Sequence, residues 1–329
     1  MKNRKNQLPS LDQGVSFNGG FTMKNYAPIV LFVYNRPWHT EQTVKALLKN
    51  ELADASDLII YSDAPKRESA AQNVEQVRRY IKSITGFKSV TIIEREKNLG
   101  LADNIIDGVT SVVNEFGSVI VLEDDIVTSP YFLRFMNEAL KFYERKEKVW
   151  HINGYLFPID SKDLNDTFFT MGMFCWGWGT WERAWKHYRR DPEKLPSRFS
   201  RSMIREFNYE NSNDFFGQVL ANKSGKLRTW AIFWYATIYL NQGLCLCSKY
   251  SLATNIGHDG SGMHCDKNSF FEVSLRGNSS FHFATQIQES ADARKLLIFF
   301  YRSLQPSILA RIKRKLLEIG ARCLKNVVF

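Results

Sequence analysis

Four short runs of β-prone apolar residues alternate with helical segments in the first part of the chain. Strands are expected at 27–34, 57–63, 89–93 and 119–122, and the helices between them at a segment capped by Thr40, at 70–83 and at 102–114. The first run is continuously apolar, as in strands that are buried on both faces of a parallel sheet. Strands and helices that alternate in this way predict an α/β fold, with a mostly parallel sheet flanked by helices.

Three consecutive acids, Glu123, Asp124 and Asp125, follow directly after the fourth apolar run. Adjacent carboxylates raise each other's pKa and destabilise a fold unless a cation or several hydrogen-bond donors neutralise them. A hard divalent cation such as Mg²⁺ or Mn²⁺ does this and keeps positions open for phosphate oxygens. The alternative is a solvated turn in which the three acids face water.

Polar residues also follow the first two predicted strands, Arg36 after one and Asp63 after the other. Ligands of open α/β sheets bind beyond the carboxyl ends of the strands. We therefore expect Arg36, Asp63 and the acids at 123–125 to meet in one site, although a chance coincidence of three polar strand ends would give the same pattern.

Composition narrows the class of protein. The chain has 329 residues, 14% aromatic residues, eight tryptophans and a formal charge of +10, so it can bury a large core and has an excess of cations for an anionic partner. Its five cysteines form no paired C-x-x-C set, and their odd number argues against a closed disulfide framework. The sequence shows neither an eighteen-residue apolar stretch nor the apolar core of a signal peptide. We expect a cytoplasmic protein, or one peripheral to the inner face of a membrane.

Polarity, periodicity and charge divide the chain into three parts. Residues 1–25 are polar and without periodicity, which predicts a disordered leader. Residues 26–285 form the expected folded domain, with a first half at 26–150 and a second half at 151–285. Residues 286–329 are the third part, a basic amphipathic tail that forms a C-terminal helical extension.

Several ordered motifs give the chain a family resemblance. They are the segments 33–37 (VYNRP), 61–63 (YSD), 121–125 (VLEDD), 129–132 (SPYF) and 153–154 (NG). In this order they resemble inverting glycosyltransferases of the GT-A fold, particularly the animal N-acetylglucosaminyltransferase that initiates complex N-glycans and its bacterial surface-polysaccharide relatives. Each motif is short, so the resemblance depends on their shared order.

The resemblance implies that residues 26–285 are the GT-A glycosyltransferase domain, with a donor-binding half at 26–150 and an acceptor-side half at 151–285. It also implies a role for each residue of the predicted site. Arg36 would reach the phosphates of a nucleotide-sugar donor, and Asp63 would hold the uracil of a UDP-sugar. Asp125 would bind a divalent cation, Mn²⁺ or Mg²⁺, while Glu123 and Asp124 would contact the ribose and the donor sugar. A cation and an arginine together stabilise the charge that develops on a departing diphosphate.

Two loops carry further candidates. The turn at 97–101 follows the third strand, and Asn98 and Gly100 would approach the base or ribose. Alternatively, this is an ordinary strand-to-helix turn in which Gly100 provides a positive φ. GT-A enzymes often supply a late histidine to the metal, which makes His264 a candidate second ligand, or else a loop histidine that faces water. The glycine-rich segment 257–262 before it suits a mobile lid.

The catalytic base is the point at which the chain departs from the family. An inverting transferase needs a carboxylate to deprotonate the acceptor hydroxyl, but the segment 230–234, which matches the base-bearing helix of the animal enzyme, contains no acid. Glu182 ends a segment that resembles the WGWGGED motif of β-1,4-galactosyltransferases, although it could equally be a first-turn helix acid. Asp259 is the second candidate, and Asp214 is a third.

The basic tail predicts a surface contact. From residue 302 onward, lysines and arginines flank one regular apolar face, as in helices that lie on anionic bilayers. This pattern favours an anionic membrane surface over nucleic acid, so we expect no nucleic-acid partner. A C-terminal helix that packs on the sheet with a solvated basic face is the alternative.

Together these features predict a metal-dependent glycosyltransferase that moves a sugar, with inversion, from a nucleotide-sugar to a saccharide or lipid-linked acceptor. A sugar nucleotidyltransferase would need a glycine-rich phosphate loop after the first strand, and residues 35–37 contain no glycine. The remaining alternative is a non-catalytic protein that binds nucleotide-sugars or glycans, which the missing base would explain.

Overall fold

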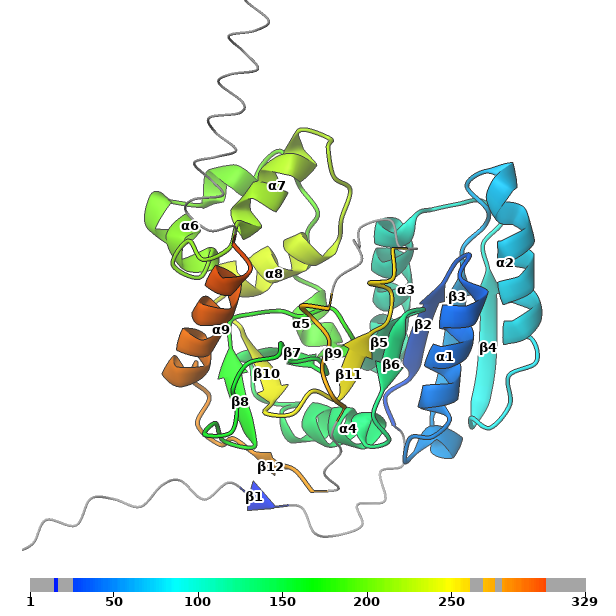
Figure 1. Ribbon diagram of the computed structural model, residues 1–329, viewed down its shortest axis with the longest axis horizontal. Helices are drawn as coiled ribbons and strands as arrows, with labels where there is room; N and C mark the ends of the chain where they lie inside the picture. Colours follow the sequence, from blue (N-terminus) through cyan, green and yellow to red (C-terminus); the bar gives the residue numbers. More distant parts are fainter. Residues whose placement is uncertain (1–14, 17–25, 261–268, 276–279, 306–329) are drawn as a thin grey trace, which may run out of the picture.

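The computed structural model describes residues 15–16, 26–260, 269–275 and 280–305. Its centre is an eight-stranded sheet in the order β4-β3-β2-β5-β9-β7-β10-β8 (Figure 1). The strands are β2 (Ile29–Val33), β3 (Asp57–Ser62), β4 (Ser89–Glu94), β5 (Ser118–Glu123), β7 (Val149–Asn153), β8 (Thr167–Thr170), β9 (Trp178–Trp181) and β10 (Leu244–Ser248). Only β9 and β8 run antiparallel to their neighbours in this sheet, so the prediction of a mostly parallel α/β sheet flanked by helices is confirmed.

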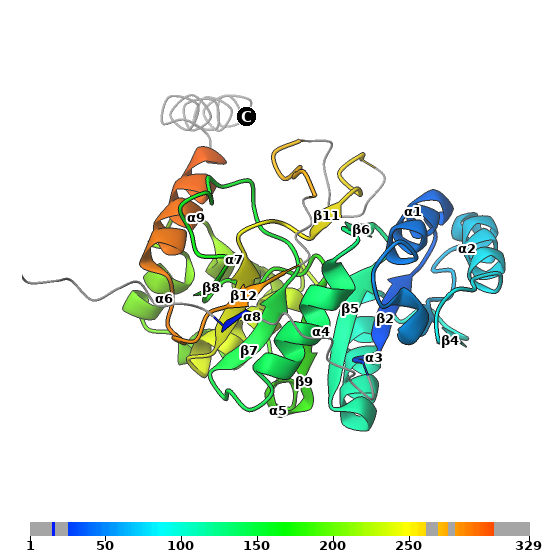
Figure 2. The same cartoon turned by 90° about the horizontal axis from the view of Figure 1, so that it is seen from below.

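Helices cover both faces of the sheet. They are α1 (Pro37–Leu47), α2 (Glu68–Ile81), α3 (Leu101–Phe116), α4 (Phe132–Phe142), α5 (Glu182–Trp185), α6 (Arg201–Phe207), α7 (Phe215–Lys223), α8 (Ala231–Leu240) and α9 (Ala291–Ser303), with short 3₁₀ turns at Ala53–Ala55 and Leu195–Arg198. Seen from below, α1, α2 and α4 lie on one side of the sheet, and α3 and α5 lie on the other (Figure 2).

Strand β2 shows why these residues form the centre of the sheet. All five of its residues are buried. Ile29 and Leu31 pack with α1, α2 and α4, whereas Val30 and Phe32 pack with α3 on the opposite face. Because successive side chains of a strand point to opposite faces, a continuously apolar run is stable only where both faces are covered.

The helix boundaries differ from the sequence prediction at one informative place. Thr40 was expected to cap α1, but the helix begins three residues earlier, at Pro37. Proline has a fixed φ suited to the first helical position and lacks the N–H that would have no partner there. The Thr40 hydroxyl instead donates to the Arg36 carbonyl oxygen at 2.9 Å, inside the first turn. The predicted start at Thr40 is therefore wrong.

Helices α6 to α9 gather beside the β8 end of the sheet, whereas α1 and α2 lie at the β4 end (Figure 1). Helix α9 buries Ala293, Leu297 and Tyr301 in the core that it shares with α8. Of the predicted basic tail, residues 306–329 lie outside the described residues. Of the predicted leader, the described part is β1 (Val15–Ser16), which pairs antiparallel with β12 (His282–Phe283).

A short two-stranded sheet lies next to the acidic cluster. Strand β6 (Ile126–Thr128) begins immediately after Asp125, and it pairs antiparallel with β11 (Ala253–Asn255). This pairing places the segment that follows Asn255 beside the carboxyl end of β5. Among the described helices, none is both long and apolar enough to pass through a bilayer.

Candidate active site

The predicted acids and Arg36 meet at the carboxyl edge of the sheet. Strands β2 and β5 are parallel neighbours, with Phe32 opposite Glu123, so the residues that follow both strands share this edge. One nitrogen of Arg36, Nη2, donates to both Asp124 Oδ1 and Asp125 Oδ2, the latter at 2.8 Å. Both aspartates are buried, at 5% and 6% exposure. The three charged side chains therefore form one buried ion cluster.

Helix α1 and the backbone hold this cluster in place. The Thr43 hydroxyl donates to the Asp124 carbonyl oxygen at 2.9 Å, which ties the turn after β5 to α1. Arg36 itself lies directly before Pro37, so the start of α1 fixes where the arginine leaves the backbone. The local sequence Arg-Pro after a buried strand thus determines the position of the Arg36 guanidinium.

The electrostatics of the cluster indicate an excess of negative charge. Burial and the charges of Asp125 and Asp124 raise the pKa of Glu123 to about 8. Burial, with the charge of Asp125, also raises the pKa of Asp124 although Arg36 opposes it. Burial disfavours the cationic form of Arg36, but the charges of the two aspartates outweigh it and raise the arginine pKa. One arginine therefore does not compensate three acids.

The donor set suits a divalent cation in part. Carboxylate oxygens are the ligands that Mg²⁺ and Mn²⁺ prefer, and a bound cation would relieve the potential that keeps Glu123 protonated at neutral pH. Within the described ranges, no three His, Cys, Asp or Glu side chains converge as a complete metal site. The acids at 123–125 thus fit a cation that takes part of its coordination from a ligand such as a diphosphate.

The segment after β11 lies directly against the ion cluster. The Ile256 N–H donates to the Asp125 carbonyl oxygen at 2.9 Å, and the Gly257 N–H donates to Asn255 Oδ1 at 2.6 Å. A Cβ atom at Gly257 would overlap Asp125 Oδ2 and would lie 2.9 Å from Arg36 Nη1. Position 257 therefore needs glycine because a side chain would collide with the cluster.

His258 and Asp259 continue this segment, and His39 of α1 contacts it. The carboxylate of Asp259 lies 3.1 Å from Nε2 of His39, which is buried in the first turn of α1. His258 packs edge-to-face on Trp176, with ring centroids 5.2 Å apart, and neither of its ring nitrogens has a hydrogen-bond partner among the described residues. His264, the predicted second metal ligand, lies outside the described residues.

Asp63 holds the turn that was predicted to contact the base or ribose. Its carboxylate is 4% exposed and accepts four hydrogen bonds, from the Ala64, Leu99 and Gly100 backbone N–H groups and the Asn98 side-chain amide, at 2.9 to 3.0 Å. Gly100 has a φ of +75°, which favours glycine. A carboxylate offers about four acceptor positions, so Asp63 is saturated. Contact with a base would require one of these donors to be displaced.

Glu182 does not reach the site. Strand β9 runs antiparallel to β5, with Trp178 opposite Val121 and Trp181 opposite Ser118. The chain therefore passes from the carboxyl end of β5 to its amino end, where the Glu182 N–H donates to the Gly117 carbonyl oxygen at 2.9 Å. Glu182 begins α5 at the edge of the sheet opposite the acids. The geometry supports its interpretation as a first-turn helix acid and removes the basis for Glu182 as the base.

Asn255, Gly257 and His39 were absent from the sequence-based list of site residues. The pairing of β6 with β11 brings Asn255 opposite Ile126, a contact between segments that are far apart in the chain. A signal for Gly257 was present, because it begins the glycine-rich segment that was predicted to be a lid. No local pattern distinguishes His39 from any other polar residue in a first helical turn.

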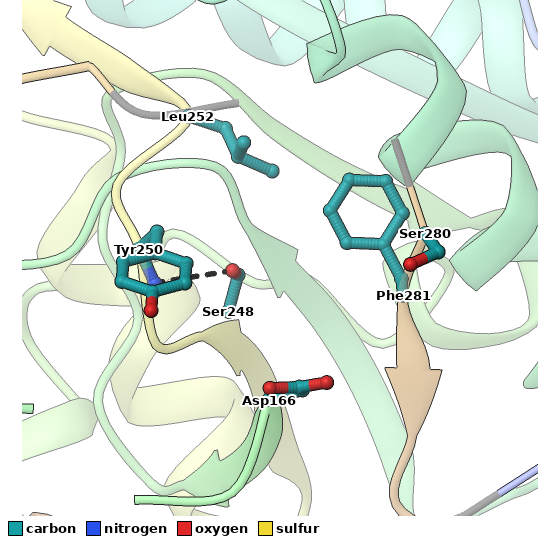
Figure 3. Close-up of a pocket in the computed structure, with 6 residues that line it drawn as sticks. All are labelled: Asp166, Ser248, Tyr250, Leu252, Ser280 and Phe281. Carbon is teal, nitrogen blue, oxygen red and sulfur yellow. Dashed lines mark hydrogen bonds between the residues drawn. The ribbon is translucent and has the colours of Figure 1, made fainter. Parts of the chain in front are cut away.

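A separate hollow lies away from this cluster, near Asp166 and Phe281 (Figure 3). Its volume is about 10 Å³, which is room for a single water. Asp166 is already paired with Lys249 at 2.8 Å and with His282 at 2.6 Å. This hollow is too small for a nucleotide or a sugar.

Comparisons with known proteins found distant structural similarity. No family model matches the chain, and no curated protein matches it. Among solved structures, the mannosyltransferase PcManGT from Pyrobaculum calidifontis in complex with GDP-Man and Mn²⁺ is 11% identical, with 66% of this chain and 70% of that chain covered and a TM-score of 0.36.

S. aureus TarS is 14% identical to this chain, with a TM-score of 0.26 over 38% of this chain and 21% of that one. Its 1–349 form in complex with UDP is 12% identical, with a TM-score of 0.28 over 39% of this chain and 34% of that one. The match thus spans about a fifth of the TarS chain and about a third of its 1–349 form. Similarities of this size carry no argument about what this chain does.

Proposed function

We propose that this protein is a metal-dependent glycosyltransferase that moves a sugar, with inversion, from a nucleotide-sugar to a saccharide or lipid-linked acceptor. A UDP-sugar is the first donor to test. The observation that supports the proposal is the ion cluster of Arg36, Asp124 and Asp125 at the carboxyl edge of the sheet, covered by Gly257. A partly buried arginine beside an excess of acids suits a ligand that brings a diphosphate together with a divalent cation.

Each residue of the edge would have a separate task. Asp125 would bind the cation, and Glu123 and Asp124 would contact the ribose and the donor sugar. Arg36 would turn from the aspartates to the diphosphate, because a cation bound to the acids would compete with it for them. The bound cation would supply electrostatic stabilisation of the departing diphosphate. Asp63 would position the turn of Asn98 and Gly100, against which the base would lie.

Asp259 is the described acid best placed to serve as base. It lies two residues from Gly257 in the segment that covers the cluster, and 46% of its side chain is exposed to an incoming acceptor. His39 contacts its carboxylate and would orient it. A base must come within hydrogen-bond reach of the hydroxyl that it deprotonates. Asp259 lies in the segment beside the acidic cluster, whereas Glu182 lies at the opposite edge of the sheet.

Release of nucleoside diphosphate tests the proposal. Wild-type protein with Mn²⁺ and a panel of UDP- and GDP-sugars should hydrolyse one donor slowly, and Asp125→Ala should reduce that rate at least about 100-fold. Chelation of the cation should have the same effect. A rate that neither change alters would contradict the metal-assisted mechanism, and donor binding without turnover would identify a nucleotide-sugar-binding protein instead.

The predicted membrane contact is a second element of the proposal, and it depends on the sequence of residues 302–329. We expect the full chain to float with liposomes that contain anionic lipids and to remain in solution with neutral ones. Deletion of residues 306–329 should abolish flotation. Binding that persists without anionic lipid would exclude the electrostatic contact.

A further inference from the structure

A cavity of about 200 Å³ lies between the loop that contains Tyr155, the segment before β9, and helices α7 and α8. Most of its lining side chains are aromatic, and Gln218 is the only side-chain amide among those described. An engineered apolar cavity of about 150 Å³ stays dry and binds benzene. A cavity of this size therefore has room for a ring or for several carbons of a chain.

The lining presents carbon rather than polar atoms to the cavity. Three of its tyrosines use their hydroxyl groups elsewhere. Tyr155 donates to the Phe271 carbonyl oxygen at 2.9 Å, Tyr235 donates to the Phe207 carbonyl oxygen at 2.8 Å, and Tyr209 shares a hydrogen bond with the Thr170 hydroxyl at 2.9 Å. A sugar ring would need partners for all of its hydroxyl groups, and these three tyrosine hydroxyls are already engaged with the protein. The chemistry favours an apolar occupant.

One tryptophan connects this cavity to the proposed catalytic edge. Trp176 lines the cavity and contacts the ring of His258, whereas its neighbour Trp178 is fully buried in the core. His258 follows Gly257, which lies against Asp125. Within the described part of the chain, the two ring nitrogens of His258 have no hydrogen-bond partner. The imidazole of His258, a polar group without a described hydrogen-bond partner, thus lies between the acids and the apolar cavity.

We propose that this cavity binds the hydrocarbon chain of an amphipathic acceptor, whose hydroxylated head lies at His258 and the acidic cluster. This inference rests on the proposed function and specifies its acceptor class as a lipid-linked rather than a free saccharide. The chain enters the cavity past Trp176, and the unpartnered nitrogens of His258 bond to the head group. Apolar burial then supplies affinity, and the polar boundary at His258 sets the register of the acceptor.

The test uses n-alkyl β-D-glucosides from butyl to octyl, below their micelle concentrations, with the full-length protein and binding heats measured by calorimetry. Each buried methylene contributes about 0.8 kcal/mol, so the Kd should fall about 3- to 4-fold per carbon until the cavity is full. Geranyl β-D-glucoside forms a separate arm that distinguishes isoprenoid from linear chains. Binding should also show a negative change in heat capacity.

Two variants fill the cavity from opposite walls, Ala231→Phe on α8 and Met173→Trp on the segment before β9. Each should abolish the dependence of Kd on chain length and leave the affinity for UDP within about twofold. Leu220→Trp is the matched control, because Leu220 is an exposed residue of α7 that does not line the cavity. It should retain the dependence. Thermal unfolding shows which variants are folded, and either filled variant is sufficient.

The outcomes separate this inference from the proposed function. A wild-type protein whose Kd does not change with chain length overturns the cavity assignment, and so does a dependence that survives in a folded filled variant. Neither result affects donor hydrolysis. Conversely, a protein that hydrolyses no nucleotide-sugar but shows the chain-length dependence retains an apolar site and loses the glycosyltransferase assignment.

Discussion

The two halves of the sheet use opposite means to form a site. At the β2–β5 edge, charged side chains contact each other, and burial together with the charges of neighbouring acids raises the pKa values of Glu123 and Asp124. At the β7–β10 side, polar groups are tied to the protein, and aromatic faces surround a cavity. The first region therefore suits the ionic ligand proposed above, whereas the second suits an apolar one.

The largest expected effect is on the free energy of unfolding, and its dependence on Mn²⁺ should differ between the two regions. Arg36→Met should lower the free energy of unfolding by about 3 kcal/mol, because it leaves two buried carboxylates without their partner. Mn²⁺ should restore part of this loss by replacing the missing charge. Chemical denaturation with and without Mn²⁺ provides the measurement.

Arg294→Met is the matched control in the other half. Arg294 is buried to a similar degree and pairs with Glu289 at 3.1 Å. Its loss should also destabilise the protein, but Mn²⁺ should not restore stability. Equal rescue of both variants would show that the cation acts on the whole protein rather than on the acidic edge.

Gly257→Ala should have the next largest effect, and it should act on activity. The added Cβ would overlap Asp125 Oδ2, so the covering segment must move away from the cluster. A displacement of about 1 Å near a reacting centre can cost about 100-fold in rate, and we expect kcat/KM for donor hydrolysis to fall by that order. Thr254→Ala, in the preceding strand, should retain activity within about threefold. Full activity of Gly257→Ala would mean that the segment is not part of the working site.

His151 provides a pH test of the aromatic half. Burial lowers the pKa of His151 to about 3, while Trp234 donates to its Nδ1 at 3.2 Å. In the unfolded chain the imidazole of His151 titrates near pH 6.5. Between pH 6.5 and 3 this group therefore binds more protons in the unfolded state than in the folded state. Stability should therefore fall as the pH drops through this window, by at most about 1.4 kcal/mol per pH unit from this group.

Replacement of the imidazole isolates this contribution. His151→Gln should be less stable at pH 7, since it disturbs a buried contact, but its stability should fall less steeply on acidification. Urea denaturation of both proteins between pH 7 and 4 measures the two slopes. Identical slopes would show that His151 does not remain neutral in the folded protein.

Glu182→Ala should have the smallest effect. Its position at the amino end of β5 predicts a change in kcat/KM of less than about twofold, together with a loss of a few tenths of a kcal/mol from the start of α5. Asp259→Ala, measured with an acceptor present, is the informative partner. A severe loss in Glu182→Ala and none in Asp259→Ala would reverse the assignment of the base.

The sequence predicts the meeting of Arg36 with the acids because this meeting follows from strand ends. Arg36 and the acids at 123–125 each follow a continuously apolar run, and parallel strands bring their carboxyl ends to one edge. The position of Glu182 also depends on the direction of a strand. Its segment has a strand pattern too, but nothing local shows that β9 runs antiparallel to β5. Gly257 meets Asp125 through the pairing of β11 with β6, which is a long-range contact without a local signal.

Equilibrium binding of UDP tests the central claim most directly. Calorimetry on the wild type with Mn²⁺ should show binding that weakens at least about 10-fold when the cation is removed, and equally when Asp125 is replaced in Asp125→Ala. Glu182→Ala should bind as the wild type does. Affinity for UDP that is the same in all four cases would contradict a cation-assisted diphosphate site at the Arg36, Asp124 and Asp125 cluster.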